Sequence, residues 1–256
     1  MAEIERDIIA EAERVIEGAQ AENVMLRVLG GVAVHLHTAD GVHPGLQRAY
    51  RDIDLVTTRK DGRATAKLMQ DLGYEPNERF NAMNGSFRLV FYDNEHGRQV
   101  DVFVGEFKMC HDIPIADRLH VDGRTIPLAE LLLTKLQIVK LDEKDLRDIW
   151  AILHEHDVAE HDDDAVNASH VAELLAGDWG LWRTSRQTIE RSRELLATAP
   201  LSEADKAMLD DRLARLWERI EAQPKGLRWR ARAKVGDRTK WYEEPEEIEH
   251  APLGDG

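Results

Sequence analysis

The chain has 256 residues and a formal net charge of −15, with 43% hydrophobic and 32% charged residues. This composition is typical of a folded protein with one large domain or two modest ones. No apolar run approaches the roughly 20 residues of a membrane span, the acidic N-terminal residues do not resemble a secretory signal, and the single cysteine, Cys110, excludes an internal disulfide. We therefore expect a cytoplasmic protein with no membrane partner. The negative charge disfavours nucleic acid as a partner, although a local basic patch could still bind it.

The first half of the chain alternates helical and strand patterns. Apolar residues at helical spacing predict helices over residues 4–19, over residues 32–36, and between Asp61 and Gly73. Short apolar or alternating segments predict strands over residues 25–29, 52–57, 87–91 and 100–104. The last two strands flank a turn that contains glycine, so they predict a hairpin.

The second half is helical throughout. Helices are predicted over residues 128–140, 143–154, 168–176, 182–197 and 202–223. The expected fold class is therefore α+β, with a mixed sheet flanked by helices and followed by a C-terminal helical domain. We predict an α/β domain over residues 1–125, a helical domain over residues 126–223, and a hairpin or tail over residues 224–256.

A Gly–Gly pair separates the strand at 25–29 from the following helix. Glycine lets the backbone approach an anion closely, and the N–H groups at the start of a helix can donate to phosphate oxygens. Gly30 and Gly31 are therefore candidate phosphate-binding residues. Taken alone, such a pair is more often a plain tight turn.

Three carboxylates lie on two predicted strands. Asp52 and Asp54 alternate with apolar residues in RDIDL, so both project from one face, and Asp101 interrupts the valines of QVDVF. Neighbouring carboxylates repel each other unless a cation lies between them, and Mg²⁺ prefers such oxygen ligands. The alternative for each acid is a solvated residue on the outer face of a strand.

The order of these features, a glycine step, a DxD strand and a later single acid, resembles the minimal nucleotidyltransferase superfamily. The resemblance implies a nucleotidyltransferase-type sheet in which Gly30 and Gly31 receive a nucleoside triphosphate. It also implies that Asp52, Asp54 and Asp101 are catalytic and hold Mg²⁺ or Mn²⁺, and that the third acid assists the attacking hydroxyl. Metal ions held between carboxylates and phosphates neutralise the charge that develops during attack on the α-phosphate.

A narrower resemblance covers about residues 24–155. The segments VLGGVAVHLH, RAYRDIDL, QVDVF and IPLAELLLTKLQIVKLDEKDLRDIWAIL are similar to AbiEii/AbiGii-toxin-like nucleotidyltransferases. In that group an arginine precedes the acid pair and a helix that follows a proline carries a lysine. Arg48 and Lys135 match these positions, which implies that they bind substrate. Gly31 replaces a serine common in the superfamily and Tyr50 replaces a usual threonine, but neither change removes a metal ligand.

Other charged groups have simpler explanations. Lys135 is as consistent with a lysine that extends to solvent from an apolar helix, and for Asp145 and Asp148 we expect a surface charge network rather than a role in orienting Lys135. The histidines at 154, 156 and 161 have no zinc-motif spacing. A basic and aromatic stretch over residues 225–242 predicts an intramolecular hairpin, with an RNA contact as the second interpretation.

The resemblance implies an enzyme that transfers a nucleoside monophosphate from a nucleoside triphosphate to a hydroxyl acceptor. Two acceptors remain open. A toxin-like protein would modify tRNA and have an antitoxin partner, whereas the acidic surface favours a small hydroxylated molecule. The alternative is a catalytically silent nucleotide-binding module that acts as a toxin–antitoxin component.

Overall fold

The computed structural model describes residues 4–38 and 41–244. Its largest sheet has five strands in the order β1-β2-β5-β4-β3. The strands are β1 (Leu26–Leu29), β2 (Ile53–Thr57), β3 (Glu75–Pro76), β4 (Arg88–Asp93) and β5 (Arg98–Val104). The β2–β5 pair is parallel and the other pairs are antiparallel, so the sheet is mixed.

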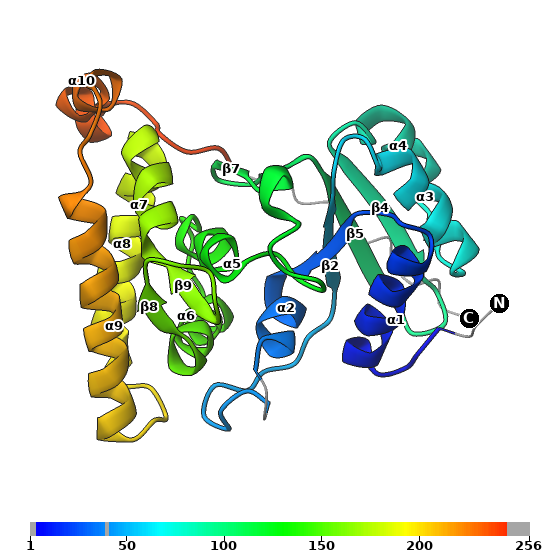
Figure 1. The fold of residues 1–256 in the computed structure, drawn as a ribbon, viewed down its shortest axis with the longest axis horizontal. Helices are drawn as coiled ribbons and strands as arrows, with labels where there is room; N and C mark the ends of the chain where they lie inside the picture. The colour runs from blue at the N-terminus through cyan, green and yellow to red at the C-terminus, as the bar shows by residue number, and fades with distance from the viewer. Residues whose placement is uncertain (1–3, 39–40, 245–256) are drawn as a thin grey trace.

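Four helices accompany these strands. They are α1 (Ile8–Ala21), α2 (Gly30–Leu36), α3 (Gly62–Asp71) and α4 (Glu78–Asn84). The Asp7 side chain caps α1 by accepting from the N–H groups of Ile9 and Ala10, which satisfies donors that have no partner within the helix. The apolar face of α1 is buried, as its helical spacing predicts. Figure 1 shows α1, α3 and α4 around the sheet on one side of the molecule.

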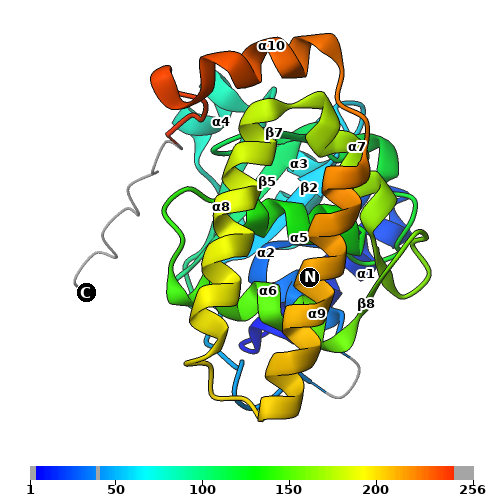
Figure 2. The same cartoon turned by 90° about the vertical axis from the view of Figure 1, so that its left-hand side faces the viewer.

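The rest of the chain is mainly helical. It comprises β6 (Glu106–Lys108), β7 (Asp112–Pro114), α5 (Leu128–Leu136), α6 (Glu143–Glu155), β8 (Asp157–Ala159), β9 (Ala165–Asn167), α7 (Ala168–Gly177), α8 (Trp179–Leu196), α9 (Glu203–Ala222) and α10 (Leu227–Val235). Every residue of α5 is buried. Figure 2 shows α8 and α9 side by side in front of α5, which accounts for the burial of α5 on that side.

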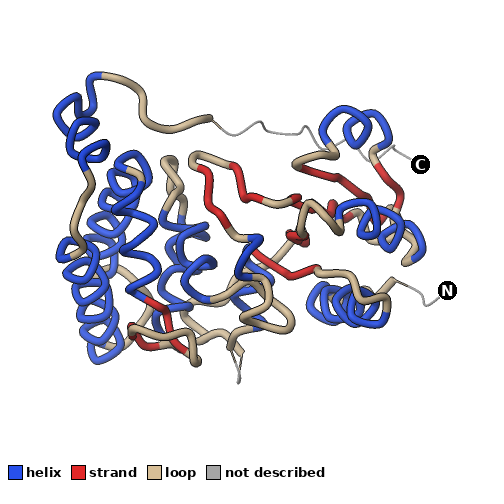
Figure 3. The backbone as a smooth tube through the Cα atoms, turned by 45° about the horizontal axis from the view of Figure 1, so that its top comes forward, coloured by secondary structure: helices blue, strands red, loops and turns tan. Residues whose placement is uncertain are grey.

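The connection between the two regions brings α5 and α6 close to the acid-bearing strands. Residues 124–126 hydrogen-bond to Val28 of β1 immediately before α5 begins. Helix α6 starts at a capping box in which the side chains of Asp142 and Asp145 bond each other's backbone N–H. Figure 3 shows the strands of the main sheet at one end of the molecule and the long helices at the other.

The predicted fold class, a mixed sheet flanked by helices and followed by a helical region, is confirmed. The hairpin over residues 87–104 is also confirmed as β4 and β5. The hairpin predicted after residue 224 is wrong for the described residues 224–244, which form α10 and a short 3-10 turn. Residues 245–256 of that predicted segment lie outside the described residues.

None of the described helices combines the length and the apolar character that crossing a membrane requires.

Candidate functional site

A cavity of about 280 Å³ lies between the sheet and the helices α5 and α6. It is lined by residues from the β1–α2 turn, the segment before β2, the strands β2, β4, β5 and β6, and both helices. Six of the seven residues singled out in the sequence line it: Gly30, Gly31, Arg48, Asp52, Asp54 and Lys135. The seventh, Asp101, is bonded to Arg88, which is also part of the lining.

The carboxylates come from adjacent parallel strands. Asp54 of β2 pairs in register with Asp101 of β5, so the two side chains lie next to each other on one face of the sheet. Asp52 is exposed and immediately precedes β2, which begins at Ile53 rather than at Asp52 as predicted. The three acids thus gather at one place, although they belong to two strands and a loop.

The environment of Asp54 disfavours a bare negative charge. Burial, followed by the nearby charges of Asp101 and Asp52, raises the pKa of Asp54 to about 7. The cations of Lys135 and Arg88 act in the opposite direction but do not offset this effect. A divalent cation would remove the repulsion that raises the pKa, and the donor set is made of oxygen, as Mg²⁺ and Mn²⁺ require. The residues therefore fit the metal that the sequence implies.

Two side chains hold Asp101 in place. Arg88 Nε and Nη2 lie 2.9 and 2.8 Å from Oδ1, and Gln99 Nε2 donates to Oδ2 at 2.7 Å. These two residues were not predicted as part of the site. Arg88 lies on β4 and points to the same face as Asp101, a relation that depends on the hairpin register and not on the spacing within either strand.

The two glycines make room for side chains of the site. Gly30 has φ +71°, and a Cβ there would overlap the carboxylate of Asp54. A Cβ on Gly31 would overlap the guanidinium of Arg48. The pair is therefore more than a tight turn, because a larger residue at either position would displace a charged group that lines the cavity.

Asp148 of α6 binds both of the predicted substrate-binding cations. It makes a bidentate pair with Arg48, at 2.7 and 2.8 Å, and lies 2.7 Å from Lys135 Nζ. Asp145 lies 3.6 Å from Lys135. Because Asp148 and Asp145 are 2% and 6% exposed, the predicted surface charge network is wrong, and the two acids orient Lys135 inside the protein.

The charges in this cluster stabilise one another. Burial opposes ionisation of Asp148, but Lys135 and Arg48 outweigh it and lower the pKa of Asp148. Burial likewise acts against the Lys135 ammonium, but Asp148 and Asp145 raise the pKa of Lys135 above its usual value. Both cations are thus fully charged at neutral pH and lie at the wall of the cavity, where they can bind an anion.

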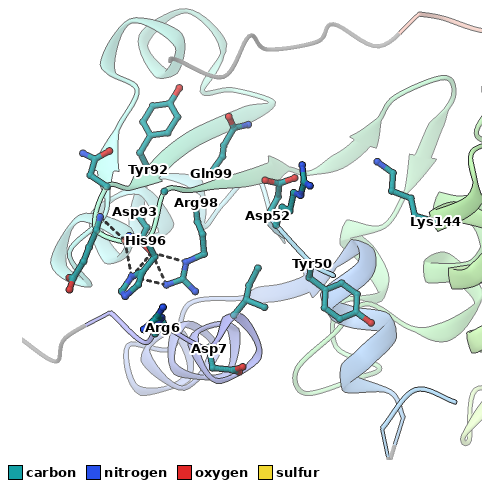
Figure 4. A pocket seen from close by; sticks show the side chains of 15 residues that line it. Arg6, Asp7, Tyr50, Asp52, Tyr92, Asp93, His96, Arg98, Gln99 and Lys144 are labelled. Atoms are coloured by element: carbon teal, nitrogen blue, oxygen red, sulfur yellow. Dashed lines mark hydrogen bonds and ion pairs between the residues drawn. The ribbon is translucent and has the colours of Figure 1, made fainter. Parts of the chain in front are cut away.

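A second, wider cleft adjoins the cavity. The two share Tyr50, Arg51, Asp52 and Lys144 in their linings. In Figure 4 this cleft extends from Asp52 along the ends of β4 and β5 to the cluster of Asp93, His96 and Arg98. A molecule in the cleft would therefore reach Asp52 at the border of the cavity.

No family model and no curated protein sequence matches the chain. Among solved structures, the chain is similar to an antigenic nucleotidyltransferase-like protein from Paracoccidioides brasiliensis, with a TM-score of 0.37 and 13% sequence identity. The match covers 70% of this chain and 91% of that chain.

Proposed function

We propose that the chain is a metal-dependent nucleotidyltransferase that transfers a nucleoside monophosphate from a nucleoside triphosphate to a hydroxyl acceptor. The observation that supports this most strongly is a cavity lined by Asp54, two cations and a glycine turn, with Asp101 in register beside Asp54. Carboxylates beside cations are suited to a ligand that carries both a metal ion and phosphates.

Each group has a role in this reaction. Asp52, Asp54 and Asp101 would hold Mg²⁺ or Mn²⁺, which supplies positive charge for the phosphate oxygens. Arg48 and Lys135 would bind the triphosphate at the glycine turn. The acceptor oxygen forms a bond to the α-phosphorus, the bond from that phosphorus to the bridging oxygen breaks, and pyrophosphate leaves. Asp101, which Arg88 and Gln99 hold, would take the proton of the acceptor hydroxyl.

The acceptor would enter through the second cleft, which reaches Asp52 from outside. Within the proposed function, the resemblance to AbiEii-like proteins favours tRNA and an antitoxin partner. The net charge of −15 favours a small cationic, hydroxylated compound. Both acceptors belong in the same assay.

The test is transfer of label from each α-labelled nucleoside triphosphate, with Mg²⁺, to total tRNA or to a panel of small hydroxylated compounds. Asp54→Asn and Asp101→Asn should each abolish transfer and leave the fold intact. Asp112→Asn, which changes an exposed carboxylate of β7, is the matched control and should retain full activity. Undiminished transfer by the Asp54 variant would disprove the proposal.

A second candidate, a catalytically silent nucleotide-binding module, has one observation in its favour. Both oxygens of Asp101 accept hydrogen bonds from the protein itself, and Asp148 pairs with Arg48 and Lys135. Calorimetry with Mg²⁺ and a nonhydrolysable triphosphate distinguishes the two. Tight binding without turnover on any acceptor would favour the silent module.

A further inference from the structure

Part of the cavity wall has no role in holding phosphates or a metal ion. Phe103, Phe107, Met109 and Ile138 contribute apolar side chains to the same lining as the acids and cations. The rings of Phe103 and Phe107 lie 4.7 Å apart at 55° to each other, and both residues are buried. An apolar, aromatic wall beside a phosphate-binding turn suits the flat ring of a nucleobase.

Gln137 adds a polar group to this wall. It is the C-cap residue that follows α5, it lines the cavity, and it is 1% exposed. Its Oε1 accepts a hydrogen bond from the N–H of His111 at 2.8 Å. Because an N–H group can bond only to the oxygen of the amide, this contact fixes which end of the side chain is Nε2.

The Nε2 group of Gln137 donates no hydrogen bond to the residues that the structure describes, and it is not among their fully enclosed polar atoms without a partner. Because Gln137 lines the cavity, this amide donor is open to it. Water completes such a donor until a ligand atom that accepts a hydrogen bond takes its place. The amide of Gln137 can therefore donate to an acceptor atom of a molecule in the cavity.

We propose that Gln137 determines substrate specificity by donating a hydrogen bond from Nε2 to the nucleobase of the triphosphate, whose ring lies against Phe103, Phe107 and Met109. This inference rests on the proposed function, because it assumes that a nucleoside triphosphate occupies the cavity. The base is the part of that substrate with acceptor atoms on a flat apolar body. The phosphates have their own cations in Arg48 and Lys135.

The experiment compares two ligands, a nucleoside triphosphate with Mg²⁺ and inorganic tripolyphosphate with Mg²⁺, in calorimetric titrations of the full chain. The readout is the ratio of the two affinities, which isolates the contribution of the nucleoside. Gln137→Glu keeps an oxygen for the N–H of His111 but removes the donor. Gln137→Met removes both the acceptor oxygen and the donor. The matched control is Gln187→Met, which changes an exposed glutamine of α8.

We expect the wild type to prefer its best nucleoside triphosphate over tripolyphosphate, and both Gln137 variants to reduce that preference about tenfold, the effect of one hydrogen bond. The control should keep the wild-type ratio. Gln137 could instead have a purely structural role, because its hydrogen bond to His111 connects the end of α5 to the β6–β7 hairpin. In that case the variants would bind both ligands more weakly to the same extent, and the ratio would stay unchanged.

The outcomes separate the inference from the function on which it rests. If the wild type binds neither ligand, the proposed function fails. If it binds both and the Gln137 variants keep the wild-type ratio, the role of Gln137 is overturned while the function stands. Ribose 5-triphosphate, tested on the wild type, covers the case of variants that fail to fold. If ribose 5-triphosphate binds as tightly as the preferred nucleotide, the base adds nothing and the inference is overturned. If it binds about as weakly as tripolyphosphate, the inference is supported.

Discussion

At the scale of single residues, the glycine turn and Asp148 form one unit. Arg48 passes over Gly31 to reach Asp148 on α6, 100 positions away in the sequence. A buried carboxylate that loses one of two cations retains an uncompensated part of its charge. The absence of a side chain at Gly31 is thus needed for the charge balance of the cavity.

We therefore predict that Gly31→Ala destabilises the protein by about 1–3 kcal/mol, the usual effect of overpacking a buried site, and weakens triphosphate binding. The added Cβ would force Arg48 away from Asp148. Urea unfolding and calorimetric titration measure the two effects. Gly123→Ala, where a Cβ meets nothing within 4 Å, is the control. Equal stability and affinity in the two variants would contradict this account of Gly31.

The raised pKa of Asp54 leads to a pH dependence of metal binding. Because the pKa is about 7, the carboxyl is largely protonated below pH 7, and a divalent ion must displace that proton. We predict that Mg²⁺ affinity rises as the pH increases from 6 to 8, by up to about tenfold per pH unit below the pKa. Calorimetric titration with Mg²⁺ across this range measures it, and Asp54→Asn should remove the dependence.

The raised pKa of Asp54 also affects the stability of the ion-free protein. Mg²⁺ affinity rises with pH, whereas the contribution of Asp54 to stability falls with pH. The usual pKa of an aspartate is 3.8, so between about pH 4 and pH 7 the folded protein retains a proton on Asp54 that the unfolded chain has released. The contribution of Asp54 to the free energy of unfolding therefore falls as the pH rises through this window. A wild type whose pH profile in chelator matches that of Asp54→Asn would count against the raised pKa.

At the scale of elements, what the sequence could predict depends on how much of each element is buried. The hairpin β4–β5 and the helices α6 to α9 have clear apolar patterns, and the prediction located each to within a few residues. Helices α4 and α10 have no buried residues, so no apolar periodicity could indicate them. Helix α5 ends at Leu136 although apolar residues continue beyond it, because the chain must turn before the extended Asp142 that caps α6.

The candidate site also could be predicted only in part from the sequence. Local spacing was sufficient to select the residues that line the cavity, since strand alternation places acids on one face and glycines mark a turn. It did not select Gln99, although its partner Asp101 lies only two residues away on the same strand. It could not select Arg88 or Gln137, whose partners are set by strand register and by contacts between distant elements. It also gave Asp148 the wrong environment, because nothing in the α6 sequence shows that Arg48 packs against it.

At the scale of the whole molecule, the distribution of charge is uneven. The chain carries −15 overall, yet α10 contains no acidic residue and exposes Arg228, Arg230 and Lys234. The three aromatic residues of the stretch over residues 225–242 have partners within the protein. Trp229 donates to Leu175 O and Trp241 to Thr184 Oγ1, and the ring of Tyr242 packs edge-on against Trp241. Base stacking on these rings is therefore not the expected mode of any RNA contact, and phosphate binding by α10 is the mode that remains.

The exposed basic residues of α10 provide a test of whether tRNA is the acceptor. If an RNA backbone meets α10, reversing the three exposed charges (Arg228→Glu, Arg230→Glu and Lys234→Glu) should weaken tRNA binding. It should also reduce the slope of log affinity against log salt by about 2–3, because each lost phosphate contact removes roughly 0.7–0.9 of slope. Filter binding or fluorescence anisotropy across a salt series measures the slope.

A control of equal charge change reverses Lys60, Arg63 and Arg79, which are exposed near the sheet. Both triple variants acquire the same net charge, so a general repulsion of RNA by the acidic protein would weaken them equally. Loss of slope only in the α10 variant would locate the contact on that helix, whereas equal behaviour of the two variants would exclude it. An acceptor other than RNA is then expected, and transfer to small hydroxylated compounds should be unaffected by either set of substitutions.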